Sequence, residues 1–226
     1  MTSKPLRARV QAMTKPDLPG AASLSDALGR LYGHPAVVLD LVSPTPGRIL
    51  FGRAATIRFV PFREDVFDTR VHAFARHFHD AVAGDPTGRV LVLAAGLVDS
   101  SVGGGVKLSR LQNHGLAGLV TDGRLRDFEA LAAYDPVFYC GGETARVGVG
   151  DVMPIAADEP VALGGTTVVP GDYIYADRAG AVVIPASALD ETVRLAHEIE
   201  AEDIGFLEAI RSEVTGNART SGSSER

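Results

Sequence analysis

The sequence predicts a single domain of the α/β class. Its 226 residues suit one domain, and an apolar content of 46% is enough for a sizeable core. The clearest element pattern is a βα-type unit, in which a short helix beginning near Val106 leads into a buried strand over 116–120. A second apolar run, 89–95, predicts another buried strand before this unit. Helix and strand patterns thus share the middle of the chain.

The domain organisation follows from composition along the chain. Residues 1–22 are polar and contain three prolines, which indicates an N-terminal arm. The domain is expected over 23–214, and the Gly/Ser/Thr/Arg-rich residues 215–226 are expected to form a disordered tail. In the first half we expect a helix over 26–31 capped by Ser23 or Ser25, a strand over 36–41, a strand-containing stretch over 49–60 and a helix over 65–83.

The second half is predicted to begin with a short helix over 128–133 and a strand over 136–140. Residues 143–160 read as irregular, 161–185 as a compact β-meander and 186–214 as the last helix. Cys140 lies between the strand and a Gly-Gly pair. With no adjacent base visible in the sequence, a buried inert thiol is a better interpretation than a nucleophile.

Three histidines, His72, His77 and His79, lie in the helix predicted over 65–83. At helical spacing His72 and His79 share a face, whereas His77 points elsewhere. Because no cysteine lies nearby, solvated or core histidines explain the trio better than a zinc site does.

Composition also limits the possible partners. The net charge of −6 argues against a general nucleic-acid binder, which is usually basic. A single cysteine excludes an internal disulfide framework and fits a reducing compartment. The sequence shows no apolar run of the ~20 residues that a membrane span needs and no apolar signal core. We therefore expect a cytoplasmic protein without membrane contact.

The stretch from residue 103 to 127 carries the most chemistry. Three consecutive glycines, 103–105, allow close approach of a ligand to the backbone, because no Cβ is present. The following helix directs free N–H groups at this loop, and Lys107 adds positive charge, which together favour a carboxylate. Arg126 can bind a carboxylate through two hydrogen bonds, and Asp127 can hold a hard divalent cation. The alternative is a plain loop with an ordinary surface ion pair.

Two motifs in this sequence resemble the RraA-like family. In the first, twenty residues separate Gly105 from the Arg126-Asp127 pair, and these residues include the run 115–123. The second is the glycine-rich pattern over 164–185. This family includes the regulator of ribonuclease activity A and the class II pyruvate aldolases, typified by 4-hydroxy-4-methyl-2-oxoglutarate aldolase with its oxaloacetate decarboxylase side activity. The resemblance covers residues 23–210.

The resemblance implies a swivelling β/β/α fold, a homotrimer or hexamer, and sites between subunits. It implies that Arg126 binds the carboxylate and keto oxygen of a small 2-oxo acid, and that Asp127 binds Mg²⁺ or Mn²⁺. Glu202, from the last helix of a neighbouring chain, would orient metal-bound water. The pyruvyl carboxylate would be held by the loop and the first helical amides, namely Gly104, Gly105, Val106 and Lys107.

One departure from the family pattern bears on the reaction. The aldolases have aspartate where this chain has Gly105, and in the family that aspartate is tied to proton transfer. Retro-aldol cleavage needs a base for the C4 hydroxyl and positive charge for the enolate. When oxaloacetate loses CO₂, the bond-breaking step needs only the positive charge and no base. Glycine in place of the aspartate should therefore slow aldol cleavage more than decarboxylation. Asp99 and His114 are candidate replacement bases.

Three functions therefore remain open. The leading one is a metal-dependent carbon–carbon lyase, an aldolase or decarboxylase, acting on a pyruvyl-type 2-oxo acid. The second is a non-catalytic protein-binding regulator, which Gly105 favours and the Arg126-Asp127 pair disfavours. The third is an enzyme of the same fold with a changed substrate, because glycine at this position makes room for a bulkier acid.

Overall fold

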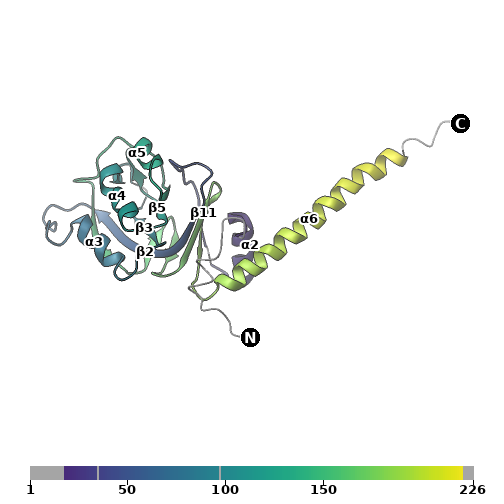
Figure 1. Cartoon of the computed structure of the whole chain (residues 1–226), viewed down its shortest axis with the longest axis horizontal. Helices are drawn as coiled ribbons and strands as arrows, with labels where there is room; N and C mark the ends of the chain where they lie inside the picture. The colour runs from purple at the N-terminus through teal and green to yellow at the C-terminus, as the bar shows by residue number, and fades with distance from the viewer. Residues whose placement is uncertain (1–17, 35, 97, 221–226) are drawn as a thin grey trace.

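The computed structural model describes residues 18–34, 36–96 and 98–220, and it confirms the predicted α/β fold (Figure 1). Its centre is an eight-stranded sheet in which β1, β12, β11, β2, β3, β5 and β7 follow one another, while β8 pairs with β2 off this path. The bounds of these strands are β1 Val37–Val38, β2 Leu50–Pro61, β3 Val90–Ala94, β5 Gly118–Thr121, β7 Val137–Tyr139, β8 Val152–Ala157, β11 Tyr173–Asp177 and β12 Gly180–Ile184.

Strand β2 joins the two halves of this sheet. Its first residues pair antiparallel with β11, its middle pairs parallel with β3, and its end pairs antiparallel with β8. Strands β3, β5 and β7 continue the parallel half. All residues of β3 and β5 are buried, as expected of parallel strands covered on both faces.

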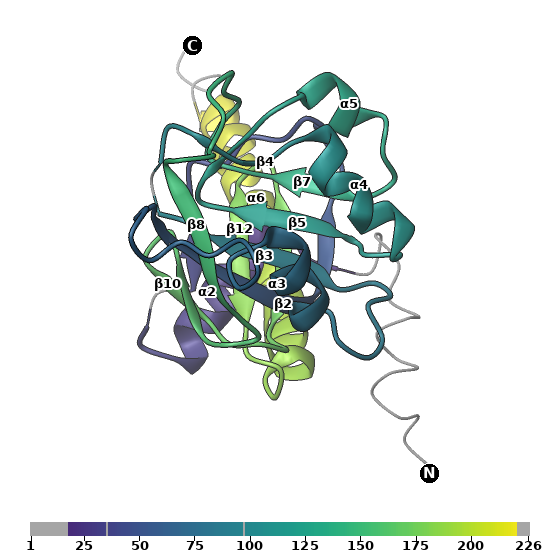
Figure 2. The ribbon, with the colours of Figure 1, turned by 90° about the vertical axis from the view of Figure 1, so that its left-hand side faces the viewer.

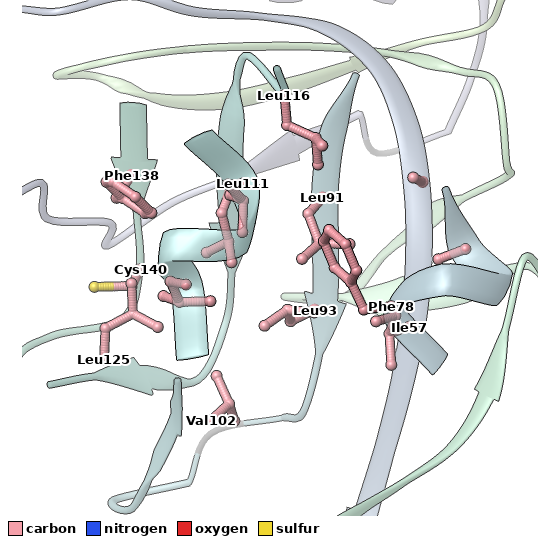
Figure 3. Packing of buried hydrophobic residues seen from close by; sticks show 14 of the residues in the cluster. Ile57, Phe78, Leu91, Leu93, Val102, Leu111, Leu116, Leu125, Phe138 and Cys140 are labelled. Atoms are coloured by element: carbon pink, nitrogen blue, oxygen red, sulfur yellow. The ribbon is translucent and has the colours of Figure 1, made fainter. Parts of the chain in front are cut away.

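Three helices cover one face of the parallel half, as Figure 2 shows. They are α3 (Phe74–Ala81), α4 (Gly105–Asn113) and α5 (Phe128–Ala132). Figure 3 shows the core between these helices and the sheet, in which Phe78 and Leu111 lie near Leu91 of β3. On the other face, a separate hairpin of β9 (Val161–Leu163) and β10 (Thr166–Val168) contributes to a second core cluster.

Two further helices of the described part of the chain pack together at the antiparallel end. Helix α2 (Ala21–Leu31) and the start of α6 (Leu189–Thr220) share a core cluster with β11 and β12. Figure 1 shows that the rest of α6 projects away from the domain. No described helix combines the length and the apolar character that crossing a membrane would require.

The connection from α4 to β5 agrees with the sequence prediction. Gly115 has a φ of 68° and ends the helix, its N–H donating to Gln112 and the Leu116 N–H donating to Leu111. A Cβ at Gly118 would run into the carbonyl oxygen of Val137, so β5 and β7 approach closely only because this residue is glycine. These contacts fix α4 against the sheet.

The helix predicted over 65–83 is wrong in length, because only Phe74–Ala81 is helical. Asp68 accepts a hydrogen bond from the backbone of Arg70 and pairs with its guanidinium. The ring of His72 bonds back to the Asp68 backbone. Such local bonds offer the chain an alternative to helix, which explains the turns before α3.

Other predicted boundaries need correction. Helix α2 starts earlier than expected and is not capped by Ser23 or Ser25; instead Asp177 and Glu200 accept the N–H groups of Ala21 and Gly20. Residues 143–160 are not wholly irregular, because β8 lies there and pairs with β2. The predicted meander is split between the β9–β10 hairpin and the main sheet.

The two ends of the chain also differ from expectation. Helix α6 starts at Leu189 and continues to Thr220, beyond the predicted end at 214. Of the expected arm, residues 1–17 lie outside the described part of the chain, as do residues 221–226 of the expected tail. The division into arm, domain and tail stays a prediction.

Candidate active site

Two short parallel strands bring the glycine loop beside the Arg-Asp pair. Strand β4 (Ser101–Gly103) pairs with β6 (Arg124–Leu125) in a sheet of its own. The N–H of Arg126 then donates to the carbonyl of Gly103 at 2.9 Å. Helix α4 follows β4 and the Arg126-Asp127 turn follows β6, so both lie at the same edge.

A hollow of about 290 Å³ opens at this edge, and we call it the small hollow. It contains four side chains that the sequence singled out, from Val106, Lys107, Arg126 and Asp127. Gly105 is buried and does not belong to the lining. The lining consists of Ser101, Gly103, Gly104, Val106, Lys107, Arg126, Asp127, Val147, Gly148 and Val149.

Asp127 is held at the N-terminus of helix α4. Its backbone is left-handed, with φ 61° and ψ 46°, a conformation that aspartate tolerates better than most residues. Its Oδ2 accepts the N–H of Gly105 at 3.0 Å, so the carboxylate satisfies one of the unpaired donors of the helix start. The positive end of the helix dipole stabilises its negative charge.

The glycine loop is needed for this arrangement. A Cβ at Gly104 would lie 2.7 Å from Oδ2 of Asp127 and 3.1 Å from Cβ of Arg126, which would push the pair away. A Cβ at Gly105 would lie 3.1 Å from Cβ of Ala130, a tighter contact than usual that a small shift relieves. A side chain at residue 104 would therefore displace the Arg126 and Asp127 side chains, whereas a side chain at residue 105 needs only a small shift of Ala130.

The small hollow carries two cationic side chains. Arg126 is half-buried and forms no ion pair with any described residue. The Lys107 ammonium donates to the carbonyl of Val102 at 3.1 Å and lies 4.9 Å from the ring centre of Phe74. Burial lowers the pKa of Lys107, and the neighbouring positive charge of Arg110 lowers it further.

Three valines surround this charged centre. Val106 is 88% exposed and Val149 86%, and Val147 is also exposed. Large apolar side chains this exposed, grouped around one hollow, favour contact with an apolar ligand group or another chain over contact with water.

Glu202 does not reach the small hollow within its own chain. It lies on α6, where its carboxylate pairs with Arg30 of α2 at 3.0 Å. A contribution from Glu202 to this site would therefore have to come from another subunit.

The histidines and the cysteine occupy other places. His77 is buried and its ring bonds to the carbonyl of Ala73, while His79 packs against His114 with ring centres 5.6 Å apart. Within the described residues there is no group of three or more His, Cys, Asp or Glu side chains that could hold a metal ion. Cys140 is fully buried, and burial raises the pKa of its thiol to about 11.

A second hollow, of about 610 Å³, has Arg124 of β6 in its lining, and we call it the large hollow. Asp122 lines it, but this carboxylate already accepts the N–H groups of Ala95, Gly96 and Gly164. Arg124 lines it too and pairs with Asp99 at 3.4 Å. The hollow is lined by Val37, Val38, Leu39, Asp40, Leu41, Gly96, Val98, Asp99, Asp122, Arg124, Gly141, Ala162, Gly164 and Gly165.

Neither replacement base considered from the sequence lines the small hollow. Asp99 lines the large hollow, and His114 packs against His79 and Phe78 at the far end of α4. Both residues are close in sequence to the glycine loop and helix α4. No local sequence pattern shows that the chain turns them away from Arg126.

Comparison with known proteins identifies the family. The family model described as "RraA-like: Aldolase/RraA" matches residues 21–183. This chain belongs to the RraA-like family. The crystal structure of RraAS2 from Streptomyces coelicolor, described as an unusual member of the RNase ES inhibitor RraA protein family, is 27% identical, with a TM-score of 0.73 over 90% of this chain and 97% of that one.

Two curated relatives match this RraA-like chain over part of their length. A protein of Halalkalibacterium halodurans provisionally named 4-hydroxy-4-methyl-2-oxoglutarate aldolase is 28% identical over 63% of this chain and 66% of its own length. Protein DlpA of Legionella pneumophila is 29% identical over 76% of this chain and 27% of its own length. The chain thus covers less than two thirds of either relative.

The residues of the RraA-like site fit a divalent cation in a limited way. Among the described residues that line the small hollow, Asp127 is the one carboxylate, and one of its oxygens is engaged by the Gly105 N–H. A single carboxylate with water and substrate oxygens is a common arrangement for Mg²⁺. Asp127 would therefore hold such an ion only with the help of a bound substrate.

Sequence reasoning missed one wall of the small hollow. The loop of Val147, Gly148 and Val149 comes from the stretch that read as irregular. A bridge from Val147 to Ser101 brings it beside β4. A Cβ at Gly148 would run into the backbone of Ser101, so the Val-Gly-Val pattern was the available signal for close approach.

Proposed function

We propose that this RraA-like protein is a metal-dependent carbon–carbon lyase acting on a 2-oxo acid of the pyruvyl type. The observation that carries the proposal is the small hollow, where Arg126, the Asp127 carboxylate and the N-terminus of α4 face one space. A protein that only binds another protein has no need for a carboxylate held in a left-handed turn beside an unpaired arginine.

Each group has a defined task in this proposal. Arg126 binds the substrate carboxylate and keto oxygen through its planar fork. The N–H groups of Val106 and Lys107, in the first turn of α4, attract the same carboxylate. Asp127 would hold Mg²⁺ or Mn²⁺, which supplies Lewis acidity for the enolate that forms when the C3–C4 bond breaks.

Gly105 limits the reaction in this proposal. It adds no second carboxylate to the small hollow, so the C4 hydroxyl of an aldol substrate lacks an acidic side chain as its base. Oxaloacetate loses CO₂ without prior deprotonation, and we expect decarboxylation to be the more robust activity.

Assembly and location are part of the same proposal. A homotrimer or hexamer would allow Glu202 of a neighbouring chain to orient water at Asp127, and the exposed end of α6 is available for such contact. The net charge of −6 favours a small acid held by a local cationic site over nucleic acid as the partner. We place the protein in the cytoplasm on its single buried cysteine.

A protein-binding regulator is the second candidate. It is favoured by the similarity to RraAS2, whose description names an RNase ES inhibitor family. The unpaired charge of the small hollow argues against it, because an inhibitor surface would not need that site.

The test is pyruvate release from oxaloacetate and from 4-hydroxy-4-methyl-2-oxoglutarate, each with Mg²⁺ and with a chelator. We expect metal-dependent turnover of oxaloacetate, and Asp127→Ala should lose both this turnover and Mn²⁺ binding in the presence of pyruvate. Metal-driven decay without protein is the control. Undiminished turnover in the folded Asp127→Ala variant would contradict the role of Asp127, and no turnover of either acid would favour the regulator.

A further inference from the structure

Lysine is used sparingly in this chain. Of its 22 basic residues, 19 are arginines and three are lysines, namely Lys4, Lys15 and Lys107. The first two lie outside the described residues, and Lys107 lines the small hollow. Arginine stays protonated at any pH that a protein tolerates, whereas lysine can release its proton when buried. A lysine in this arginine-rich chain therefore suggests a task that arginine cannot perform.

Burial and a neighbouring positive charge lower the pKa of Lys107, whereas a carbonyl and an aromatic ring beside the ammonium stabilise its charged form. Its ammonium donates to the carbonyl of Val102 and lies over the ring of Phe74, and no described carboxylate forms an ion pair with it. Arg110 on α4 is the charged neighbour that acts on Lys107, and the Arg126-Asp127 pair lines the same hollow. Helix α3, which supplies Phe74, also carries the titratable or charged residues Arg76, His77, His79 and Asp80. Burial and Arg110 both lower the pKa of Lys107.

The other side chains of the small hollow are unsuited to accept a proton. The guanidinium of Arg126 is already protonated and therefore cannot accept a proton. The carboxylate of Asp127 accepts the Gly105 N–H and is the proposed metal ligand. The hydroxyl of Ser101 donates to the carbonyl of Gly103 at 2.5 Å. Lys107 remains as the side chain of this lining that can both take up and return a proton.

We propose that Lys107 is the proton carrier of this site, a role that rests on the proposed lyase function. As a neutral amine it takes the proton of the C4 hydroxyl of a 4-hydroxy-2-oxo acid. The O–H electron pair forms the new carbonyl at C4, and the C3–C4 pair becomes the enolate. The resulting ammonium returns the same proton to C3, which completes pyruvate and restores the amine without any other reactant.

The first experiment compares two reactions in one variant. Lys107→Arg keeps the positive charge but cannot deprotonate, so we expect the ratio of aldol cleavage to decarboxylation to fall by at least about 100-fold. Oxaloacetate and 4-hydroxy-4-methyl-2-oxoglutarate are the substrates, and the melting temperature checks the fold. An equal loss of both reactions would overturn the proposal, because a structural defect does not distinguish them.

The pH profile gives an independent readout. In the unchanged protein kcat/KM for aldol cleavage should rise with pH and level off above the pKa of Lys107, which lies below the usual lysine value, and this rise should be absent in Lys107→Arg. Arg110→Met is the matched control, because removing the positive charge should shift the rise to higher pH. If the increase in kcat/KM with pH is unshifted in Arg110→Met and still present in Lys107→Arg, this pH dependence belongs to a group other than Lys107.

Chemical labelling tests the lysine without catalysis. Competitive acetylation by acetic anhydride, read by mass spectrometry against pH, should label Lys107 with a midpoint below the ordinary pKa of lysine. Reduction with borohydride in the presence of pyruvate should leave Lys107 unmodified. A trapped pyruvate adduct would replace the proton-carrier role by covalent catalysis.

Failure of the two proposals can be told apart. If the unchanged protein turns over neither acid, the lyase function fails and the role of Lys107 fails with it. If it decarboxylates oxaloacetate but cleaves no aldol substrate, or if Lys107→Arg leaves the ratio unchanged, the lyase function stands and only the role of Lys107 is overturned.

Discussion

The large and the small hollow differ in whether their charged side chains already have partners of opposite charge or backbone donors. The large hollow has twice the volume, yet its carboxylate Asp122 accepts three backbone N–H groups and its Arg124 is paired with Asp99. In the small hollow Arg126 and Lys107 have no carboxylate partner among the described residues. Charges that the fold leaves unpaired are better indicators of a binding site than the volume of a cavity.

Burial has the same electrostatic effect on Lys107 and Cys140 but opposite consequences for their reactivity. It disfavours the charged form of both, so it moves Lys107 towards the amine and keeps the thiol of Cys140 protonated. The amine is the basic form of lysine, whereas the protonated thiol is the unreactive form of cysteine. Burial therefore favours the basic form of Lys107 in the small hollow and the unreactive form of Cys140 beside the large hollow.

The strongest test of this comparison replaces two arginines that are two residues apart. Arg126→Met should lower kcat/KM for oxaloacetate by roughly 1,000-fold, because the substrate carboxylate loses its charge-assisted hydrogen bonds. Arg124→Met, in the large hollow, should change it by less than about fivefold, because an exposed ion pair contributes at most ~1 kcal/mol. Steady-state kinetics measure both, and similar losses would place the active site in the large hollow instead.

A smaller effect is expected for the buried thiol beside Gly141 of the large hollow. The folded pKa of Cys140 is raised to about 11, so between the unfolded pKa and this value only the unfolded state ionises. Stability from the neutral thiol is therefore complete below about pH 8.5 and should decline by about 2 kcal/mol as the pH rises to 11.

Denaturant unfolding at pH 8 and pH 10.5 measures this decline. Cys140→Ala is the control, because alanine has nothing to ionise and its stability should fall less over the same interval. Equal slopes for the two proteins would show that the thiol is more accessible to water than its burial indicates.

The smallest expected effect concerns metal affinity in the small hollow. Gly105→Asp places a second carboxylate beside Asp127 and should tighten Mn²⁺ binding about tenfold, provided that Ala130 shifts slightly to accept the new Cβ. Gly105→Asn has the same shape without the charge and should bind Mn²⁺ no better than the unchanged protein. Isothermal titration compares the three, and an equal gain in both variants would attribute it to shape alone.

The parts of the fold with strong local signals could be predicted from the sequence. Strand β3 is a continuous apolar run, and α4 is bounded by a glycine loop and by Gly115 at a positive φ. The sequence of the βα-type unit over 103–127 predicts that the glycine loop lies close to Arg126 and Asp127. In the structure this proximity depends on the short β4–β6 pairing.

The remaining features depend on contacts between distant residues. Strand β8 exists because the end of β2 pairs with it, and the Val147–Val149 wall depends on a bridge to Ser101. The cap of α2 is provided by Asp177 and Glu200, far along the chain. Neither propensity nor periodicity records such partners.

Helix α6 combines two segments of very different local stability. Up to Ile199 its apolar residues pack against α2 and the sheet, whereas from 201 to 213 every side chain is exposed, including Ile204, Phe206, Leu207 and Ile210. An unsupported helix of this length is marginal in water. Its amide protons should therefore exchange with deuterium quickly in a free chain and slowly once another subunit covers them, so that exchange along this one helix reports assembly.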